Sequence, residues 1–407
     1  MSDERQYDVV VYGASGFVGS LTARYLANHA PVGARIALAG RSASKLEALR
    51  AQLPAAAREW PVVVADSGDA DALARLVAST RAVATTVGPY AKYGRGLVEA
   101  CARAGTHYAD LTGEVLFVRE SIEATDALAR ETGARIVHAC GYDSVPSDLG
   151  LWVVAQQAAA DGAGGLTDVT TVATARGGLS GGTFDSLRTQ VELTAADPAA
   201  RRIVADPHAL SPDRDGEPVR RPPRDVGPPG RGPGGRWTAP FGMAPFNTRI
   251  VRRSNALTGW SYGRDLRYQE RFGTGRGPVG AFAAGGMTAG LGALVAGFSF
   301  RPTRALLDRV LPAPGEGPSE RSQANGWFRM DIHAATASGA RYHGIVSGRG
   351  DPGYRATAVM LGESALCLAL DALPDRAGSL TPATAMGGAL VERLRAAGHT
   401  YTVAPAR

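Results

Sequence analysis

The sequence predicts an α/β protein with two folded units: an N-terminal doubly wound parallel sheet and a second α+β domain carrying an antiparallel sheet. Six short apolar runs that alternate with helical segments over residues 1–148 indicate the first unit. A glycine-rich turn directly after the first run points to the same architecture. Two strand-like runs within residues 327–348 flank an Ala-Ser-Gly turn, which predicts a hairpin in the second unit. A length of 407 residues also favours two domains over one.

The glycine-rich turn has the spacing of a dinucleotide-binding site in a Rossmann domain. The apolar run Val9–Val11 predicts a strand buried on both faces, and a helical stretch begins near Phe17. In the intervening pattern G-x-x-G-x-x-G, the glycines permit a tight turn, a close approach to a pyrophosphate, and contact between helix and strand. The helix N-terminus favours an anion. A glycine-rich turn without a ligand is the alternative. The residues predicted to bind the cofactor here are Gly13, Ser15, Gly16, Phe17, Val18 and Gly19.

The end of the second predicted strand favours NADP over NAD. An NAD site of this type places an acidic residue there to bind the ribose 2′-hydroxyl. This sequence has Arg41 and Ser42 instead, with Lys45 one helical turn later. A guanidinium can bind a 2′-phosphate through paired hydrogen bonds, whereas a carboxylate would repel it. Solvated surface charges are the alternative interpretation of Arg41 and Lys45. Asp66, at the end of the third strand, is predicted to bind the adenine amino group.

Polar loops follow the later strands of the predicted parallel sheet, at residues 88–93, 111–114 and 141–148. Ligands of doubly wound sheets bind beyond the carboxyl ends of the strands, so we expect these loops to form the wall of one site. The loop residues predicted to contact the cofactor are Gly88, Pro89 and Thr112.

Motifs in these loops carry a family resemblance. GASGFVG, TTVGPYAKYG, EACARAGTHYADLTGE and ACGYDSVPSDLG occur in the order and spacing of the saccharopine dehydrogenase-like oxidoreductases. GGTFDS and GRGDPGYRATAVMLGESALCLALD resemble the branch that contains the actinobacterial trans-acting enoyl reductases. The resemblance covers most of the chain. It implies an NADP(H)-binding Rossmann domain, a second α+β domain, and an oxidoreductase that reduces an enoyl group of a lipid or polyketide intermediate. The turn at 141–146 departs from the Gly-Leu-Asp-Pro-Gly type of enzymes acting on saccharopine itself, which speaks against an amino-acid substrate.

The turn after the sixth strand carries the candidate catalytic residues. Enoyl reduction needs a hydride, which NADPH supplies, and a proton. Tyr142 is the preferred proton donor, Asp143 is expected to orient it or to bind the ribose, and Ser144 stands beside them. Tyr90, on a neighbouring loop, is the other candidate. Alternatively, this turn only closes the cofactor pocket through side chain-to-backbone hydrogen bonds.

Three segments are expected along the chain. Residues 1–148 form the NADP-binding domain, residues 149–349 the α+β substrate domain, and residues 350–407 C-terminal helices that can pack back on the first domain. Residues 205–235 hold eight prolines and six glycines, which excludes regular helix or central strand and predicts an extended loop or lid. A disordered surface insertion is the alternative for this loop.

Residues 277–300 form an unusual stretch of 24 residues without a charge, between Arg276 and Arg301. Its length satisfies a membrane span, but seven glycines and six alanines make it small rather than strongly apolar. Because exposed helical glycine costs up to about 1 kcal/mol, a buried small-residue helix ranks first. An interfacial element that contacts lipid ranks second and a true span third.

Composition limits the remaining partners. The net charge of +6 comes from arginines spread along the chain, and no basic run is interleaved with aromatics, so nucleic acid is not expected. The cysteines are three and widely spaced, which fits a reducing cytosol, and no metal site is expected. The N-terminus lacks a secretory signal, so we expect a cytoplasmic protein, with or without peripheral membrane contact. A substrate bound to a carrier and a homodimeric assembly are both compatible with the sequence. An amino or imino dehydrogenase and a catalytically silent NADP-binding, lipid-associated protein are the alternative functions.

Overall fold

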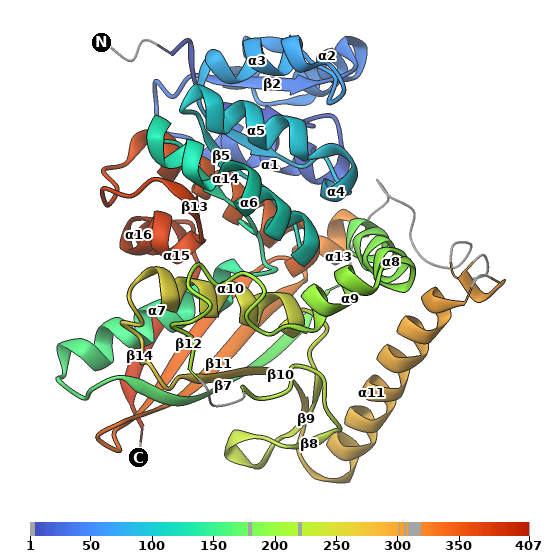
Figure 1. The fold of residues 1–407 in the computed structure, drawn as a ribbon. Coiled ribbons are helices and arrows are strands. Elements are labelled where there is room, and N and C mark those ends of the chain that lie inside the picture. Colours follow the sequence, from blue (N-terminus) through green and yellow to red (C-terminus); the bar gives the residue numbers. More distant parts are fainter. Residues whose placement is uncertain are drawn as a thin grey trace.

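The structure is a computed structural model of the chain, and it describes residues 5–177, 181–218, 222–300, 302–304, 307 and 319–406. Two seven-stranded sheets form its framework, sheet A in the upper half of Figure 1 and sheet B in the lower half. Sheet A has the order β13-β6-β5-β4-β1-β2-β3, and all its neighbouring strands run parallel. The predicted doubly wound sheet is therefore confirmed. Its strands are β1 (Tyr7–Tyr12), β2 (Ile36–Gly40), β3 (Val62–Val64), β4 (Thr80–Thr85), β5 (His107–Ala109), β6 (Arg135–Val137) and β13 (Gly378–Leu380).

Helices cover both faces of sheet A because its central strand is apolar on both sides. Val9 and Val11 of β1 belong to one buried cluster, which includes residues of α1 (Phe17–His29), α2 (Ala43–Gln52) and α14 (Thr357–Leu370). Val10 and Tyr12 belong to the opposite cluster, with residues of α3 (Ala70–Ala78), α5 (Arg95–Ala104) and α6 (Val115–Thr132). The short elements η1 (Ala55–Ala57) and α4 (Tyr90–Tyr93) complete this half.

Sheet B has the order β14-β12-β11-β7-β10-β9-β8. The predicted hairpin is confirmed: β11 and β12 pair antiparallel, with His333 opposite His343 and their rings stacked at 4.7 Å. The sheet is mixed rather than purely antiparallel, because β7 and β10 run parallel. The connection between them spans ninety residues and includes helices, as a parallel crossover requires. The strands of sheet B are β7 (Leu166–Arg176), β8 (Gly230–Arg231), β9 (Trp237–Pro240), β10 (Arg267–Gly275), β11 (Trp327–Thr336), β12 (Arg341–Arg349) and β14 (Thr400–Pro405).

The helices of this half connect the two sheets. α7 (Val145–Ala160) leaves the carboxyl end of β6 and packs on β12 and β11, while α10 (Ala244–Leu257) contacts α7 and β10. The remaining described elements are α8 (Gly181–Ala196), α9 (Pro198–Ala205), η2 (Pro233–Gly235) and α13 (Glu320–Ala324). The side chains of the GGTFDS motif lie outside the described part.

The Pro/Gly/Arg-rich loop at 205–235 is held against α10 by buried arginines of that helix. Arg249 donates to the carbonyls of Asp206 and Val204, and Arg252 donates to the Pro207 carbonyl. Arg253 donates to the carbonyls of Leu210 and Ser379. The loop also contains β8 and η2; residues 219–221 lie outside the described part.

The C-terminal segment, expected to be helical, contributes two strands as well. β13 adds a seventh strand to sheet A beside β6, and β14 forms an edge of sheet B beside β12. η3 (Pro352–Ala356), α14, α15 (Pro382–Ala385) and α16 (Gly387–Ala396) are its helices. α14 packs against α1 and lies over β4, β1 and β5, so the last part of the chain covers the first.

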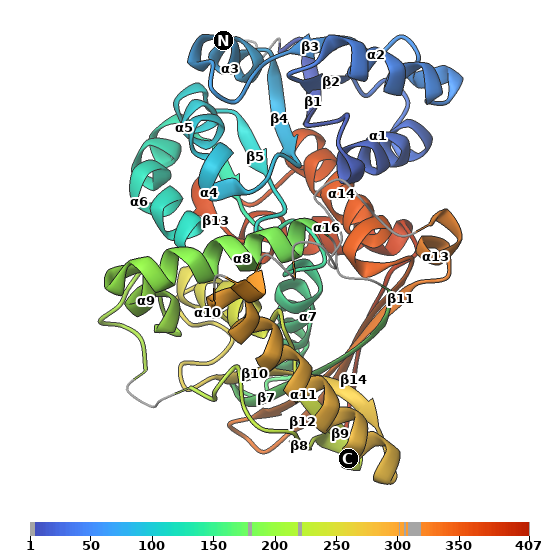
Figure 2. The ribbon, with the colours of Figure 1, turned by 90° about the vertical axis from the view of Figure 1, so that its right-hand side faces the viewer.

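The charge-free segment forms one long helix, α11 (Gly277–Ser299), which stands at the edge of the molecule in Figure 1 and runs across the front of its lower half in Figure 2. The first-ranked expectation of a buried helix is wrong, because Val279 is 81% exposed and Phe282 is 86% exposed. The small residues that suggested close packing line a face that the described residues leave largely uncovered. α11 is the described helix that is long and apolar enough to cross a membrane.

Candidate active site

The turn between β1 and α1 has the backbone that a bound pyrophosphate requires. Gly13 adopts φ +83°, which favours glycine, and a Cβ there would lie 2.7 Å from Val87 Cγ2. A Cβ on Gly19 would lie 2.2 Å from the Gly13 carbonyl oxygen, so the start of α1 packs on the turn itself. No side chain among the described residues caps α1, and Ser15 and Gly16 are exposed. The first amides of α1 are therefore available to an anion, which fits a dinucleotide.

The basic end of β2 lies beside this turn. Arg41 and Lys45 are exposed, and the Ser42 hydroxyl caps α2 by accepting from the Lys45 amide at 3.5 Å. Burial and, to a smaller extent, the charge of Asp66 raise the pKa of the Tyr12 hydroxyl to about 12, against the opposing charge of Arg41. Arg41 and Asp66 thus lie within electrostatic reach of the same hydroxyl at the end of β1. Asp66 also accepts from the Gly68 amide at 2.9 Å.

Arg41→Asp is expected to remove most of the preference for NADPH over NADH, which lacks the 2′-phosphate. A charged hydrogen bond to the 2′-phosphate contributes on the order of 1.5–3 kcal/mol, so the ratio of the two dissociation constants should fall by roughly tenfold to a hundredfold. Fluorescence titration of each cofactor measures the ratio. Arg24→Asp, on the exposed surface of α1, is the charge-matched control. Equal dissociation constants in the unchanged protein would contradict the assignment.

The loops after β4 and β5 are tied to each other by structural hydrogen bonds. The Tyr90 hydroxyl donates to the Thr85 carbonyl and accepts from the Leu111 amide, both at 3.1 Å. The Glu114 carboxylate accepts from the amides of Tyr90 and Ala91, at the start of α4. The Thr112 hydroxyl accepts from the Glu114 amide at 3.1 Å, and the Gly88–Pro89 peptide that precedes α4 is cis. Tyr90 and Thr112 are thus close to the predicted site, with their hydroxyls engaged by backbone.

Asp110 connects the β5 loop to the end of β6. Its carboxylate accepts from the Tyr108 hydroxyl, from the amides of Thr112 and Ala139, and contacts His138 Nδ1 at 2.7 Å. Ala139 adopts φ +61°, so this carboxylate holds the backbone in a conformation that alanine rarely takes. The buried side chain therefore positions the turn at 141–144, where the candidate catalytic residues lie.

The three predicted residues of this turn have different surroundings. Tyr142 is buried, its ring packs edge-on against Phe328 of sheet B at 5.1 Å, and its hydroxyl has no hydrogen-bond partner among the described residues. Asp143 is half-buried, and burial together with the charge of Asp110 raises its pKa to about 7. The Ser144 hydroxyl donates to the Asn247 side chain of α10 at 3.2 Å. Tyr142 and Ser144 thus face the second half of the chain.

A buried glutamate of β10 completes this cluster, and its sequence pattern did not indicate it. Glu270 is fully buried and accepts from the Tyr268 hydroxyl at 2.6 Å and from the Asn247 amide at 2.9 Å. Burial raises its pKa to about 7. Burial raises the pKa of Tyr142 as well, and the charge of Glu270 is the next largest cause. A titratable carboxyl therefore lies within electrostatic reach of the unpartnered tyrosine hydroxyl.

The C-terminal segment closes the other side of the turn. The Thr357 hydroxyl at the start of α14 accepts from the Tyr142 amide at 3.0 Å. Tyr354 of η3 packs edge-on against Phe17 of the glycine turn, with ring centroids 5.0 Å apart. The segment GRGDPGYRATAVM is thus placed between the glycine turn and the Tyr142 turn, a role that its sequence pattern did not indicate.

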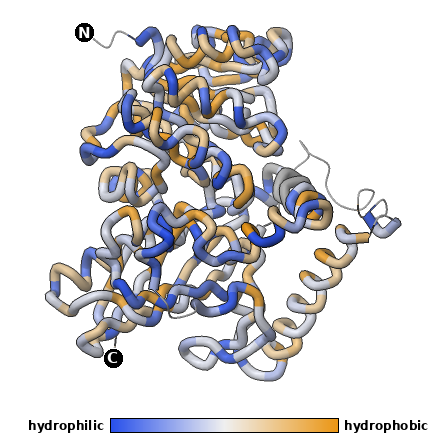
Figure 3. The backbone as a smooth tube through the Cα atoms, viewed as in Figure 1, coloured by the Kyte–Doolittle hydropathy of each residue, from blue (hydrophilic) through white to orange (hydrophobic). Residues whose placement is uncertain are grey.

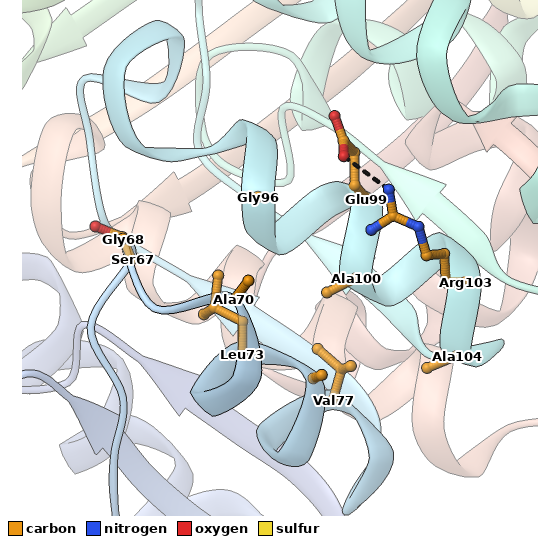
Figure 4. A pocket seen from close by; sticks show the side chains of 11 residues that line it. Ser67, Gly68, Ala70, Leu73, Val77, Gly96, Glu99, Ala100, Arg103 and Ala104 are labelled. Carbon is orange, nitrogen blue, oxygen red and sulfur yellow. Dashed lines mark hydrogen bonds and ion pairs between the residues drawn. The ribbon is translucent and has the colours of Figure 1, made fainter.

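A groove elsewhere on the N-terminal half has no relation to this cluster. It lies between α3 and α5, has a volume of about 480 Å³, and is lined mainly by small and apolar side chains (Figure 4). Glu99 and Arg103 pair with each other on its rim at 3.0 Å. None of the predicted cofactor or catalytic residues lines it. Among the described residues, no group of His, Cys, Asp and Glu side chains could hold a metal ion.

Comparison with known proteins agrees with this geometry. Residues 9–137 match the protein-family model for the saccharopine dehydrogenase NADP binding domain. With the glycine turn and the basic end of β2, this match defines an NADP-dependent oxidoreductase with a Rossmann domain. The chain is 49% identical over 406 residues to a Mycobacterium tuberculosis protein whose name provisionally assigns it as a trans-acting enoyl reductase. The alignment covers 97% of this chain and 96% of that protein. The chain is 45% identical over 410 residues to the trans-acting enoyl reductase of Mycobacterium bovis, covering 97% of each. The chain belongs to this trans-acting enoyl reductase family.

A solved structure shows the same overall fold. This structure is apo histidine-tagged saccharopine dehydrogenase (L-Glu forming) from Saccharomyces cerevisiae, which matches with a TM-score of 0.56 and 13% sequence identity. The match covers 98% of this chain and 99% of the yeast chain. At this identity the match concerns the fold alone. The predicted resemblance, fold class and NADP(H) cofactor are therefore confirmed, while the roles of the individual site residues stay predictions.

Proposed function

We propose that this protein reduces an enoyl carbon–carbon double bond with NADPH, and that Tyr142 donates the proton. NADPH, when bound, supplies the hydride. The names of the relatives support the reaction type. The observation that carries the proposal is the Tyr142 hydroxyl, which is buried and has no hydrogen-bond partner among the described residues. A buried hydroxyl without a partner costs free energy, so a site that retains one is suited to a ligand that completes the bond.

The position of Tyr142 fits a proton donor. Its turn follows β6, and the carboxyl ends of β4, β5 and β6 continue the row that begins at the glycine turn of β1. Ligands of such sheets lie along this edge. Tyr142 would hydrogen-bond the substrate carbonyl or protonate the carbon next to it. Its raised pKa keeps the hydroxyl protonated at neutral pH.

Glu270 would supply the proton that restores Tyr142 after each turnover, and water would have to carry it, because the Tyr142 hydroxyl bonds no side chain among the described residues. Its pKa of about 7 lies near the operating pH, where a carboxyl can both hold and release a proton. Tyr268 and Asn247 fix both of its oxygens, so the carboxyl is oriented before substrate arrives.

The rate of the unchanged enzyme is expected to fall as pH rises above about 7, because the protonated fraction of Glu270 then declines. Glu270→Gln should lower kcat and remove this inflection from the pH profile of kcat. Asp143→Asn is the matched control, because Asp143 also has a pKa of about 7 and should leave the inflection in place. An inflection that persists in Glu270→Gln and disappears in Asp143→Asn would assign the titration to Asp143 instead.

A lipid or polyketide intermediate, presented by a carrier protein, is the proposed substrate. The relatives' names call them trans-acting, which fits a substrate held by a separate protein. The buried arginines of α10 speak against an amino-acid substrate, because Arg249, Arg252 and Arg253 donate to backbone carbonyls. Arg249 and Arg252 also lie 3.3 and 3.7 Å from Asp225. Their charges are engaged in holding the 205–235 loop, away from any substrate carboxylate.

An NADPH oxidation screen tests the proposed function. α,β-Unsaturated acyl groups on coenzyme A and on acyl carrier protein are compared with unsaturated ketones and with imines. Turnover of the unsaturated acyl substrates, with faster turnover on the carrier protein, is the expected result. Turnover of imines alone would favour an amino or imino reductase. NADPH binding without turnover of any substrate would favour a catalytically silent protein.

A further inference from the structure

α11 presents an apolar surface that the described residues do not cover. The side turned toward the protein includes Gly280, Ala284 and Phe298, which are buried. The opposite side carries Val279 and Phe282, which are 81% and 86% exposed. Figure 3 shows the helix in white to orange along its whole length, set apart from the rest of the molecule. An exposed large apolar face of this kind indicates an interaction site.

The polar atoms of α11 are suited to an apolar medium. None of its 23 residues is charged. Its two hydroxyl side chains bond back to the helix: Thr288 donates to the Ala284 carbonyl at 2.7 Å, and Ser299 donates to the Val295 carbonyl at 2.9 Å. The backbone is satisfied within the helix, so lipid contact would leave no unpaired polar group along its middle.

Cationic and aromatic side chains surround the N-terminal end of the helix. Arg276 immediately precedes it and is exposed, and its guanidinium donates to the Gly234 carbonyl at 3.1 Å. Arg231 is also exposed and lies over the ring of Trp237 at 5.2 Å. Trp237 pairs with Gly275 at the end of β10, so the three side chains share one corner of the molecule. Neither arginine forms an ion pair within the described part of the chain. Arginine and tryptophan beside an apolar helix are the composition of a lipid–water boundary.

Both ends of α11 are fastened to the same half of the protein. At its start, Thr274 donates to the Gly280 carbonyl and to the Trp237 carbonyl, at 2.9 and 3.1 Å. Beyond its end, Arg304 donates to the Phe298 carbonyl and pairs with Glu192 of α8 at 2.6 Å. If a helix is bonded to one domain at both ends, it cannot cross a bilayer unless part of that domain also enters the bilayer. It can lie along the surface.

We infer that α11 lies in the surface of a membrane that contains anionic lipid, with Val279 and Phe282 among the acyl chains and Arg231 and Arg276 at the phosphate groups. The unpaired arginines supply the charge complementarity, and the uncharged outer face supplies the apolar area. This inference stands apart from the proposed reaction, because none of these residues belongs to the NADP site or to the Tyr142 cluster.

Co-sedimentation of the full chain with vesicles tests the inference. Vesicles of phosphatidylcholine mixed with phosphatidylglycerol should bind the protein, and vesicles of phosphatidylcholine alone should bind it less. Added salt should weaken binding because it screens the arginines. Phe282→Asp combined with Val279→Asp should lower the partition coefficient at least about tenfold, since each change replaces an apolar side chain with a charge. Arg231→Ser combined with Arg276→Ser should remove the preference for phosphatidylglycerol.

Val32→Asp is the matched control, because Val32 is fully exposed in the turn between α1 and β2, outside α11. It should bind vesicles like the unchanged protein. NADPH titration and thermal unfolding show that each variant remains folded. Absence of vesicle binding by the unchanged protein would overturn the inference. A dimer in sedimentation velocity that Phe282→Asp dissociates, without vesicle binding, would assign this face to a second copy of the chain.

Discussion

Tyr142→Phe is expected to lower kcat by about 10²–10⁴ while the dissociation constant of NADPH changes by no more than a few-fold. The hydroxyl contacts no other polar group among the described residues, so its removal leaves no protein partner unpaired. The ring and its contact with Phe328 remain in the variant. The loss should therefore fall on proton transfer. Single-turnover oxidation of NADPH, followed by absorbance, measures hydride transfer apart from substrate binding and product release, and it slows if the Tyr142 proton is needed as the hydride moves.

Tyr90→Phe is the matched comparison for this prediction. The Tyr90 hydroxyl is also buried, but it donates to the Thr85 carbonyl and accepts from the Leu111 amide. Its removal should lower the free energy of unfolding by about 1–3 kcal/mol, because two buried backbone groups lose a partner. Hydride transfer should change little. An unchanged rate in Tyr142→Phe would assign the turn to packing of the cofactor, and the proton would then come from Tyr90 or from water.

Gly19→Ala is expected to raise the dissociation constant of NADPH by up to about a hundredfold and to destabilise the fold by about 1–3 kcal/mol. The added Cβ would lie 2.2 Å from the Gly13 carbonyl oxygen and 2.9 Å from Ala14 Cα. Both are backbone atoms, so the turn that faces the pyrophosphate must move. Titration with NADPH and chemical denaturation measure the two effects.

Gly290→Ala serves as the control for the added methyl group. Gly290 lies within α11, and a Cβ there would meet no heavy atom of the described residues within 4 Å. Alanine in this exposed helix should leave NADPH binding unchanged and stabilise the helix by up to about 1 kcal/mol. Unchanged NADPH affinity in Gly19→Ala would place the pyrophosphate away from this turn.

The N-terminal half was predictable because its signals are local. The run Val9–Val11 and the glycine spacing after it combine strand, turn and helix within a few residues, and that combination fits one kind of domain. β13 gave no such signal. Its three residues form a strand because the edge of β6 stands beside them, and that edge depends on the whole sheet.

The missed residue of the site has the same explanation. Tyr268 and Glu270 alternate along β10 like the exposed polar positions of many strands. α10 brings Asn247 onto Glu270, and the resulting burial gives the glutamate its raised pKa. The error over α11 has a different cause. Small apolar residues suit a buried helix and a lipid-facing helix equally well, so composition could not separate the two.

The packing of α14 over β1, β4 and β5 has a consequence for how the chain is made. The N-terminal half leaves the ribosome first, but residues 357–370 that cover one face of its sheet are among the last to appear. Until then α1 and α2 are the helices made early that share a buried cluster with this face, and the part of it over β4 and β5 lacks its α14 cover. The unfinished chain is consequently prone to aggregate, and a chaperone would have to shield this face while most of the protein is still being synthesised.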